Sequence, residues 1–374
     1  MSTQKLGTPM CVPLHIGLEI MINGSEQIKP TWIRFRPKGL PVSLRLDRRV
    51  PFVLLLLIGA LLAMMIISTG FGEYPIAPLD VLRAVVGWET SNPDYELVVR
   101  TFRLPRILLA LLVGMALGLS GGIMQGITRN DLADPGILGV SAGAGVLVVW
   151  YVTTAESATP QMMSLLALVG AFTAVFLIYI LAWKDGSSSI RLILIGVGIS
   201  AVGTALINFW IIRSDIHQAQ AALVWLSGSV YGADWEQVRR MSLWMLVLLP
   251  LTLLLARQLN LLHLGDGIAR GIGVRVEGHR ALLILIAAAL AAASVSVAGI
   301  VAFVGFVAPH IARRLVGPSH EGMLLITAVF GGLLLVGADF ASRVVIAPSE
   351  IPLGVTTAII GAPYFAYLLY KNGR

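Results

Sequence analysis

Long apolar runs recur along this chain of 374 residues and constrain its fold more than any other feature. A helix needs about 20 apolar residues to cross the hydrocarbon core of a bilayer. The runs therefore predict an all-α polytopic membrane protein with about ten transmembrane helices. The expected spans are 51–70, 104–126, 137–155, 162–183, 192–212, 241–256, 281–302, 303–315, 323–342 and 352–370.

Two of the expected spans are short, namely 241–256 and 303–315. Pro309 interrupts the second of them, and a proline in a helix removes one backbone hydrogen bond. Unsatisfied backbone is tolerated at membrane depth only where protein or water covers it. The sequence therefore predicts an irregular helix at 303–315 that is buried inside the protein.

Composition excludes several classes of protein. Hydrophobic residues make up 57% of the chain and charged residues 13%, against about 25% charged residues in ordinary soluble domains. A cytosolic enzyme, a disordered scaffold and a secreted disulfide module are all excluded. Cys11 is the single cysteine, so the chain has no internal disulfide and no cysteine-based metal site.

The distribution of basic residues sets the expected orientation. The net charge is +7, but the basic residues lie at the ends of apolar runs and not in a patch with aromatic residues, so we expect no nucleic-acid partner. Residues 1–50 form a basic tail, which we place in the cytoplasm as a solvated or loosely surface-bound arm. Ten spans (51–370) then return residues 371–374 to the cytoplasm. The tail either anchors the topology only or also touches anionic lipid. Its basic residues are Lys5, Lys29, Arg34, Arg36, Lys38, Arg45, Arg48 and Arg49.

Two of the spans carry stripes of residues spaced four apart. In the second span the stripe is all glycine, which predicts a central helix whose backbone packs closely against its neighbours. In the fifth span the stripe is small and polar, which indicates either hydrogen bonding between helices or the wall of a polar pathway. The stripes are Gly114, Gly118, Gly122 and Gly126, and Gly196, Ser200, Thr204 and Asn208.

The chain lacks the motifs of an energy source or a catalyst. Acidic groups and histidines do not form a relay through the spans, although ion-driven carriers usually need one near the midplane. A Gly-x-x-x-x-Gly-Lys-[Ser/Thr] phosphate loop is absent from the sequence. The Gly-x-Ser-x-Gly pattern at 139–143 opens an apolar helix and not a strand–turn–helix elbow, so catalysis by Ser141 is a remote alternative. The motor is therefore expected on another molecule.

Segment 257–280 is too short and too charged to span a membrane. Its pattern predicts two short helices broken at Gly271 and Gly273, with Asp266 capping the second helix through its carboxylate. A compact cytoplasmic element of this kind suits docking of a soluble partner. The alternative is a solvated connecting loop.

Arg103 and Arg106 open the second span from the outer side of the membrane. They lie three residues apart and so share a helix face, with Pro105 in the first turn. Arginine is unfavourable at a helix N-terminus, and basic residues are usually scarcer on this side. The pair therefore points to contact with carboxylates of an acidic partner, with snorkelling to lipid headgroups as the alternative.

Six segments together resemble the permease subunits of bacterial ABC importers for ferric siderophores, haem and cobalamin. The resemblance runs from about residue 51 to residue 370. The segments are R103-L-P-R106, the stretch 120–143 (SGGIMQGITRNDLADPGILGVSAG), L264-G-D-G-I-A-R-G-I-G-V274, G305-F-V-A-P-H-I-A-R313, A338-D-F-A-S-R343 and E350-I-P-L-G-V-T-T-A-I-I-G-A-P363.

This resemblance implies two five-helix halves related by an inverted repeat, and it implies partners. They are a second permease subunit in a homodimer or heterodimer, two ABC ATPase subunits that bind ATP and Mg, and a periplasmic substrate-binding protein. The chain itself needs no cofactor. The implied location is the bacterial inner membrane.

The resemblance also assigns roles to residues. Arg103, Arg106 and Arg343 match the family's arginines that dock the binding protein. Asn130-Asp131-Leu132 match its cytoplasmic gate, with Asp131 in place of the usual proline. The polar stripe of the fifth span matches the translocation pathway. Residues that match the ATPase-coupling segment are Leu264, Gly265, Asp266, Ala269, Arg270, Gly271, Gly273 and Val274, with Asp266 replacing the usual glutamate.

The expected cargo is a ferric siderophore, and the segments W183-K-D-G and R191-L-I-L-I-G-V-G-I are more like those of catecholate permeases. Cobalamin or haem is the alternative within the family. An ion-coupled secondary transporter is the alternative outside it.

Overall fold

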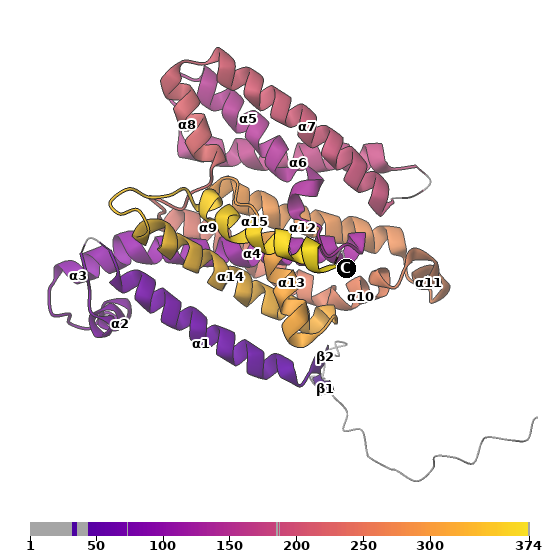
Figure 1. Ribbon diagram of the computed structural model, residues 1–374, viewed down its shortest axis with the longest axis horizontal. Coiled ribbons are helices and arrows are strands. Elements are labelled where there is room, and N and C mark those ends of the chain that lie inside the picture. The colour runs from indigo at the N-terminus through magenta and orange to yellow at the C-terminus, as the bar shows by residue number, and fades with distance from the viewer. Residues whose placement is uncertain (1–31, 36–43, 73, 185, 187, 373–374) are drawn as a thin grey trace, which may run out of the picture.

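The chain folds as a bundle of long helices (Figure 1), described by a computed structural model over residues 32–35, 44–72, 74–184, 186 and 188–372. Within these described ranges, eight helices are long and apolar enough to cross a membrane. They are α1 (Arg49–Gly70), α4 (Leu104–Thr128), α6 (Pro160–Ala182), α7 (Ser189–Arg213), α9 (Trp235–Leu254), α12 (Val276–Ala298), α14 (His320–Val344) and α15 (Leu353–Asn372).

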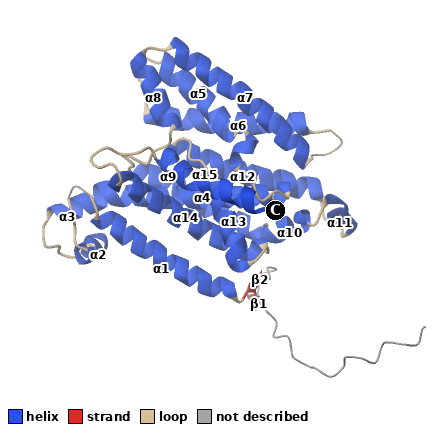
Figure 2. Cartoon of the chain, in the orientation of Figure 1, coloured by secondary structure: helices blue, strands red, loops and turns tan. Residues whose placement is uncertain are grey.

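Two shorter helices occupy the remaining predicted spans. These are α5 (Val140–Thr154) and α13 (Val304–Val316). Each of the ten predicted segments is thus helical, and the all-α polytopic fold is confirmed (Figure 2). The prediction of an interruption at Pro309 was wrong, because α13 runs through Pro309 as one helix. The helix is nevertheless buried along most of its length, as the sequence suggested.

Shorter elements connect the spans. On one end of the bundle lie α2 (Pro78–Val86), α3 (Asp94–Leu97) and α8 (Ile216–Leu226). On the other end lie α10 (Ala256–His263) and α11 (Asp266–Gly271), and the loop after α4 contains a 3₁₀ turn, η2 (Pro135–Leu138). In Figure 1, α2 and α3 appear at the left, whereas α10, α11 and the hairpin of the tail lie to the right.

The described part of the tail forms a hairpin and not only a loose arm. Strands β1 (Trp32–Phe35) and β2 (Leu44–Asp47) pair antiparallel, with Trp32 opposite Asp47, and β2 contacts α14. The sequence analysis did not predict this hairpin. Lys5, Lys29, Arg36, Lys38 and the C-terminal Arg374 lie outside the described residues.

Helix α4 forms the centre of the bundle and packs against α9, α12, α13 and α14. A second group, α5 to α8, lies along one side and is joined to the centre through α12 (Figure 1). Lipid surrounds such a bundle, so close packing and not exclusion of water associates the helices. Glycines allow this closeness, because Gly114 of α4 and Gly331 of α14 meet backbone to backbone.

Helix α9 begins six residues earlier than the predicted span, at Trp235. Its start is a capping box, in which the Asp234 side chain accepts from the Gln237 backbone N–H at 2.8 Å and the Gln237 side chain accepts from the Asp234 N–H. This cap stabilises a helix start at Trp235, so α9 includes the charged residues Glu236, Arg239 and Arg240, which hydropathy alone excluded from the span.

Candidate functional site

Arg106 lies near the N-terminal end of α4, the end expected to face outward, and is held by two carboxylates of its own chain. Its Nε donates to Asp339 Oδ1 of α14 at 2.9 Å. Its Nη1 and Nη2 donate to the two oxygens of Glu350 at 2.9 and 2.8 Å, which is a bidentate pair. The Arg106 side chain is 12% exposed, Asp339 is 1% exposed and Glu350 is 32% exposed. Arg106 therefore joins α4, α14 and the segment that precedes α15.

The other two predicted docking arginines lie in the same region. Arg343 pairs with Asp339 at 3.2 Å and also donates to the backbone carbonyl and hydroxyl of Ser68 in α1. Arg103 donates to the carbonyl oxygens of Thr69 and Tyr74 at 2.6 and 2.7 Å. The structure thus brings all three arginines to one end of the bundle. We call Arg103, Arg106, Arg343, Asp339 and Glu350 the outer cluster.

The helical setting of these arginines differs from the expectation. The helix begins at Asp94 and not at Arg103, and it contains a π-helical stretch, η1 (Val98–Arg103), which ends two residues before Pro105. Pro105 has no N–H to donate to the carbonyl four residues earlier, and a π stretch is one way to accommodate such a gap. Arg103 and Arg106 therefore sit inside a longer helix and are not exposed to an unfavourable N-terminal dipole.

A pocket of about 410 Å³ opens beside the outer cluster. Arg106, Asp339 and Glu350 are among the residues that line it, and the ring of Tyr231 lies 5.8 Å from the Arg106 guanidinium. Ser229 and Ser342 also line the pocket. The pocket combines charged, hydroxyl and aromatic groups, so it is suited to a polar side chain of a partner.

At the opposite end, α10 and α11 form a compact element between the spans α9 and α12. Gly265 precedes α11 with φ of 114°, and Gly273 follows it with φ of 82°. These backbone angles favour glycine, since a side chain would be strained in both positions. Two short helices are present as predicted, but the break between them falls at Leu264–Gly265. Gly271 is instead the last residue of α11, and Gly273 lies between α11 and α12.

Asp266 does not cap α11 with its side chain, which corrects the prediction. Its carboxylate instead accepts from Arg280 of α12 at 2.6 Å and from Arg129, the residue that follows α4. Burial acts to raise the pKa of Asp266, but the hydrogen bond and charge of Arg280, together with Arg129, outweigh it and hold the pKa below its usual range. The charged carboxylate thus fixes α11 to two spanning helices.

The surface of this element presents apolar side chains. Leu264, Ile268 and Ile272 are spaced four apart, and each is more than half exposed. Ala269 is buried beneath them, and Arg270 pairs with Glu277 at 3.3 Å. An exposed apolar patch outside the membrane spans is typical of a protein interface. Sequence reasoning missed Ile268, although the spacing of Leu264, Ile268 and Ile272 was visible.

The segment Asn130-Asp131-Leu132 follows α4 at the same end. The Asn130 side chain accepts from the Leu132 backbone N–H at 3.0 Å and so closes a short turn. Asp131 pairs with Arg313 of α13 at 2.6 Å, and Arg313 donates to the fully buried Gln125. Where the resembling family has proline, this chain therefore has an ion pair to α13, which sequence reasoning did not anticipate.

The polar stripe of α7 turns gradually outward. Gly196 is buried, Ser200 is half-buried, and Thr204 and Asn208 are exposed. Thr204 donates its hydroxyl to the Ser200 carbonyl within the same helix. The structure therefore places the C-terminal part of the stripe, Thr204 and Asn208, on an open face of this chain.

The glycine stripe of α4 lies in helix contacts throughout. A Cβ at Gly114 would lie 2.3 Å from the carbonyl oxygen of Gly331, and one at Gly118 would lie 3.0 Å from that of Thr327. Gly122 faces Leu324 of α14, and Gly126 faces Leu259 of α10 together with His320.

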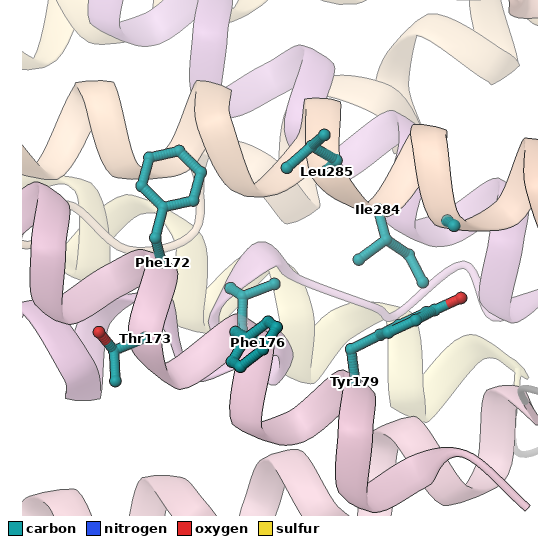
Figure 3. Close-up of a pocket in the computed structure, with 8 residues that line it drawn as sticks. Phe172, Thr173, Phe176, Tyr179, Ile284 and Leu285 are labelled. Carbon is teal, nitrogen blue, oxygen red and sulfur yellow. The ribbon is translucent and has the colours of Figure 1, made fainter.

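A separate pocket of about 480 Å³ lies between α6 and α12 (Figure 3). Phe172, Phe176 and Tyr179 project into it from α6, and Ile284 and Leu285 lie on the α12 side. Its lining is almost wholly apolar, so it offers few partners to a polar iron chelate. Among the described residues, no group of three or more His, Cys, Asp or Glu side chains could hold a metal ion.

Comparisons with known proteins agree on a transport family. Residues 59–371 match the FecCD transport family. The chain is 45% identical over 312 residues to the iron(3+)-hydroxamate import system permease protein FhuG of Bacillus subtilis (strain 168), which covers 82% of this chain and 92% of the relative.

Two further matches point the same way. The chain is 42% identical to the achromobactin transport system permease protein CbrC of Dickeya dadantii (strain 3937), over 88% of this chain and 93% of the relative. A solved metal-chelate type ABC transporter in an inward-facing conformation superimposes with a TM-score of 0.78 at 32% identity. That match covers 86% of this chain and 99% of the other.

Proposed function

The chain belongs to the FecCD transport family, and from this premise we propose that it is the permease subunit of an ATP-driven importer for ferric siderophores. It is a multi-pass membrane protein, and its relatives named above are an iron(3+)-hydroxamate import permease and an achromobactin transport permease. The proposed location is the bacterial inner membrane, with both termini in the cytoplasm. The proposed assembly has a second permease subunit, two ATPase subunits that bind ATP and Mg, and a periplasmic binding protein.

The observation that carries the proposal is the element α10–α11. It presents exposed Leu264, Ile268 and Ile272 at one end of the bundle. Asp266 ties the same element to Arg280 and Arg129, which adjoin the spans α12 and α4. A partner that binds the apolar patch can therefore move two spanning helices through one carboxylate. The sequence lacks a phosphate loop, so this partner would supply the ATP chemistry.

Transport then follows as an exchange between two arrangements of the helices. Binding of ATP to the partner subunits favours one arrangement, and hydrolysis favours the other. The chain provides the pathway and performs no catalysis of its own. Selectivity would rest with the binding protein, and Gly196, Ser200, Thr204 and Asn208 would line a wide polar path.

Uptake of radiolabelled ferric siderophore in a strain that lacks this chain tests the proposal. Uptake should return with the chain and fail when the nucleotide-binding lysine of the partner ATPase is replaced. A secondary transporter would instead lose uptake with an uncoupler while ATP is maintained. Uptake that persists without a competent ATPase would overturn the proposal.

The class of siderophore needs its own experiment. The sequence favours a catecholate, whereas the relatives named above take iron(3+)-hydroxamate and achromobactin. Parallel uptake assays with a ferric catecholate, a ferric hydroxamate, haem and cobalamin separate the cargo classes. Preference for the ferric catecholate supports the finer proposal.

Docking of the binding protein is proposed at the outer cluster. Replacement of Arg103 and Arg106 by glutamate should weaken docking and uptake while the protein still inserts into the membrane. Compensating lysines on the partner should restore part of the function. Unchanged uptake would overturn the docking role and favour the alternative of snorkelling to lipid headgroups.

A further inference from the structure

We propose that Glu350 is an internal competitor that occupies the docking site of Arg106 until an acidic side chain of the binding protein displaces it. This inference rests on the proposed docking role of the outer cluster and adds a mechanism to it. Its chemistry is the exchange of one carboxylate for another on a single guanidinium.

The geometry of Arg106 requires such an exchange. A guanidinium can bind a carboxylate through two parallel hydrogen bonds along either of two edges. Asp339 takes the edge that carries Nε, and Glu350 fills the edge that carries Nη1 and Nη2, at 2.9 and 2.8 Å. The side chain of Arg106 is only 12% exposed, so a partner carboxylate cannot bind in the same manner while Glu350 stays.

The two carboxylates on Arg106 differ in their capacity to leave. Asp339 lies within α14, is 1% exposed and also pairs with Arg343. Removal of this group would leave buried positive charge without a partner, which is costly. Glu350 is 32% exposed and lies in the segment between α14 and α15. Asp339 is therefore the fixed counterion that orients Arg106, and Glu350 is the exchangeable one.

The backbone around Glu350 allows the side chain to leave by rotation alone. Ile351 donates to the Ser342 carbonyl at 3.1 Å, and Leu353 donates to the Gly228 carbonyl at 3.0 Å. These bonds hold the segment whether or not Glu350 contacts Arg106. Exchange therefore does not require the segment to unfold.

The structure also provides a place for the incoming group. The pocket of about 410 Å³ adjoins Arg106 and is lined in part by Ser229 and Tyr231. The ring of Tyr231 is largely exposed and lies near the guanidinium. A glutamate or aspartate side chain fits a space of this size and would meet hydroxyl groups as well as Arg106. The expected partner surface is thus acidic and projects a side chain.

The test uses the full-length chain in nanodiscs and the binding protein identified by co-purification with it. Glu350→Gln removes the competing charge but keeps the size of the side chain. We expect the binding protein to bind about three- to tenfold more tightly, mainly through faster association, because a partly exposed charge-assisted pair no longer opposes it. Glu350→Asp, which keeps the charge, should bind close to wild type.

A matched control separates this effect from a general change of charge. Glu96 lies near the same end, is largely exposed and pairs with Arg100, so Glu96→Gln makes the same chemical change outside the cluster. It should leave the dissociation constant unchanged. Thermal unfolding of each variant checks that the fold is retained.

Two outcomes would overturn the inference and are distinguishable. If Arg106→Glu weakens binding but Glu350→Gln leaves it unchanged or weaker, Glu350 is not a competitor and the docking surface still stands. If Arg106→Glu binds as wild type does, the docking role of the outer cluster fails, and the competitor role fails with it. Tighter binding by Glu350→Gln with weaker binding by Arg106→Glu supports both.

Discussion

Helices α4 and α7 have the same length of 25 residues, and each carries four residues spaced four apart, yet they have opposite environments. Helix α4 is buried along most of its length, whereas α7 buries only one narrow face. The glycine stripe of α4 lies against the backbones and side chains of other helices, and the polar stripe of α7 emerges onto an open face. Residue type and neighbours, and not spacing, therefore decide what a stripe does.

The geometry of the α-helix explains the divergence. Four residues turn a helix by about 400°, so each member of such a stripe lies about 40° further round than the one before. On α4 this drift does not expose the stripe, because other helices surround α4 and α14 runs along the stripe. On α7 the drift takes the stripe from buried Gly196 to exposed Asn208. Burial on α7 instead follows Leu192, Gly196, Gly203 and Ile207.

The largest expected effect comes from Gly114→Leu in the buried stripe. The new side chain would overlap the backbone of Gly331, since even a Cβ would lie 2.3 Å from its carbonyl oxygen. We expect a loss of about 3 kcal/mol or more of stability and little folded protein in the membrane. Size-exclusion chromatography after heating measures this loss.

The matched control for that variant is Gly198→Leu in α7. A Cβ at Gly198 would meet nothing within 4 Å, so the same change should be tolerated. Equal stability of the two variants would break the comparison, because it would show that close packing along α4 does not hold the fold.

An intermediate effect is expected from Asn208→Leu at the exposed end of the polar stripe. Folded protein should be retained, and uptake of the iron chelate should fall roughly five- to tenfold, about the worth of one hydrogen bond. Val197→Leu changes another exposed position of α7 and should leave uptake unaltered. Full uptake with Asn208→Leu would show that Asn208 does not line the pathway and that this face of α7 contacts lipid or another helix.

The smallest effect is expected from Thr204→Val, which removes a hydroxyl and keeps the shape. Because Thr204 donates to the Ser200 carbonyl of its own helix, its hydroxyl is already satisfied. We expect uptake to change less than about twofold, as for a replaceable hydrogen bond near water. A larger loss than that of Asn208→Leu would reverse the order of importance along the stripe.

Much of the fold could be predicted because hydropathy is a local property. The ten apolar segments all became helices, including the two that were expected to be short, which became α9 and α13. Boundaries failed where local charge or proline misled the prediction. The cap at Asp234 extends α9 into charged sequence, and the helix before Pro105 continues back to Asp94.

Contacts between distant residues could not be predicted. Arg106 and Glu350 are 244 residues apart, so no local sequence pattern predicts that they form a pair. Asp266 has the residue type and position of a helix cap, but Arg280 and Arg129 provide stronger, charged partners. Asp131 likewise pairs with Arg313 only because α13 returns beside the end of α4.

The central claim is that this chain is a passive conduit driven by a separate ATPase. Reconstitution in proteoliposomes tests it most directly, with the chain alone or together with its co-purified ATPase and binding protein. We expect accumulation of ferric siderophore against its gradient only in the complete assembly and only with ATP and Mg. Sustained uphill accumulation by the chain alone would contradict the claim.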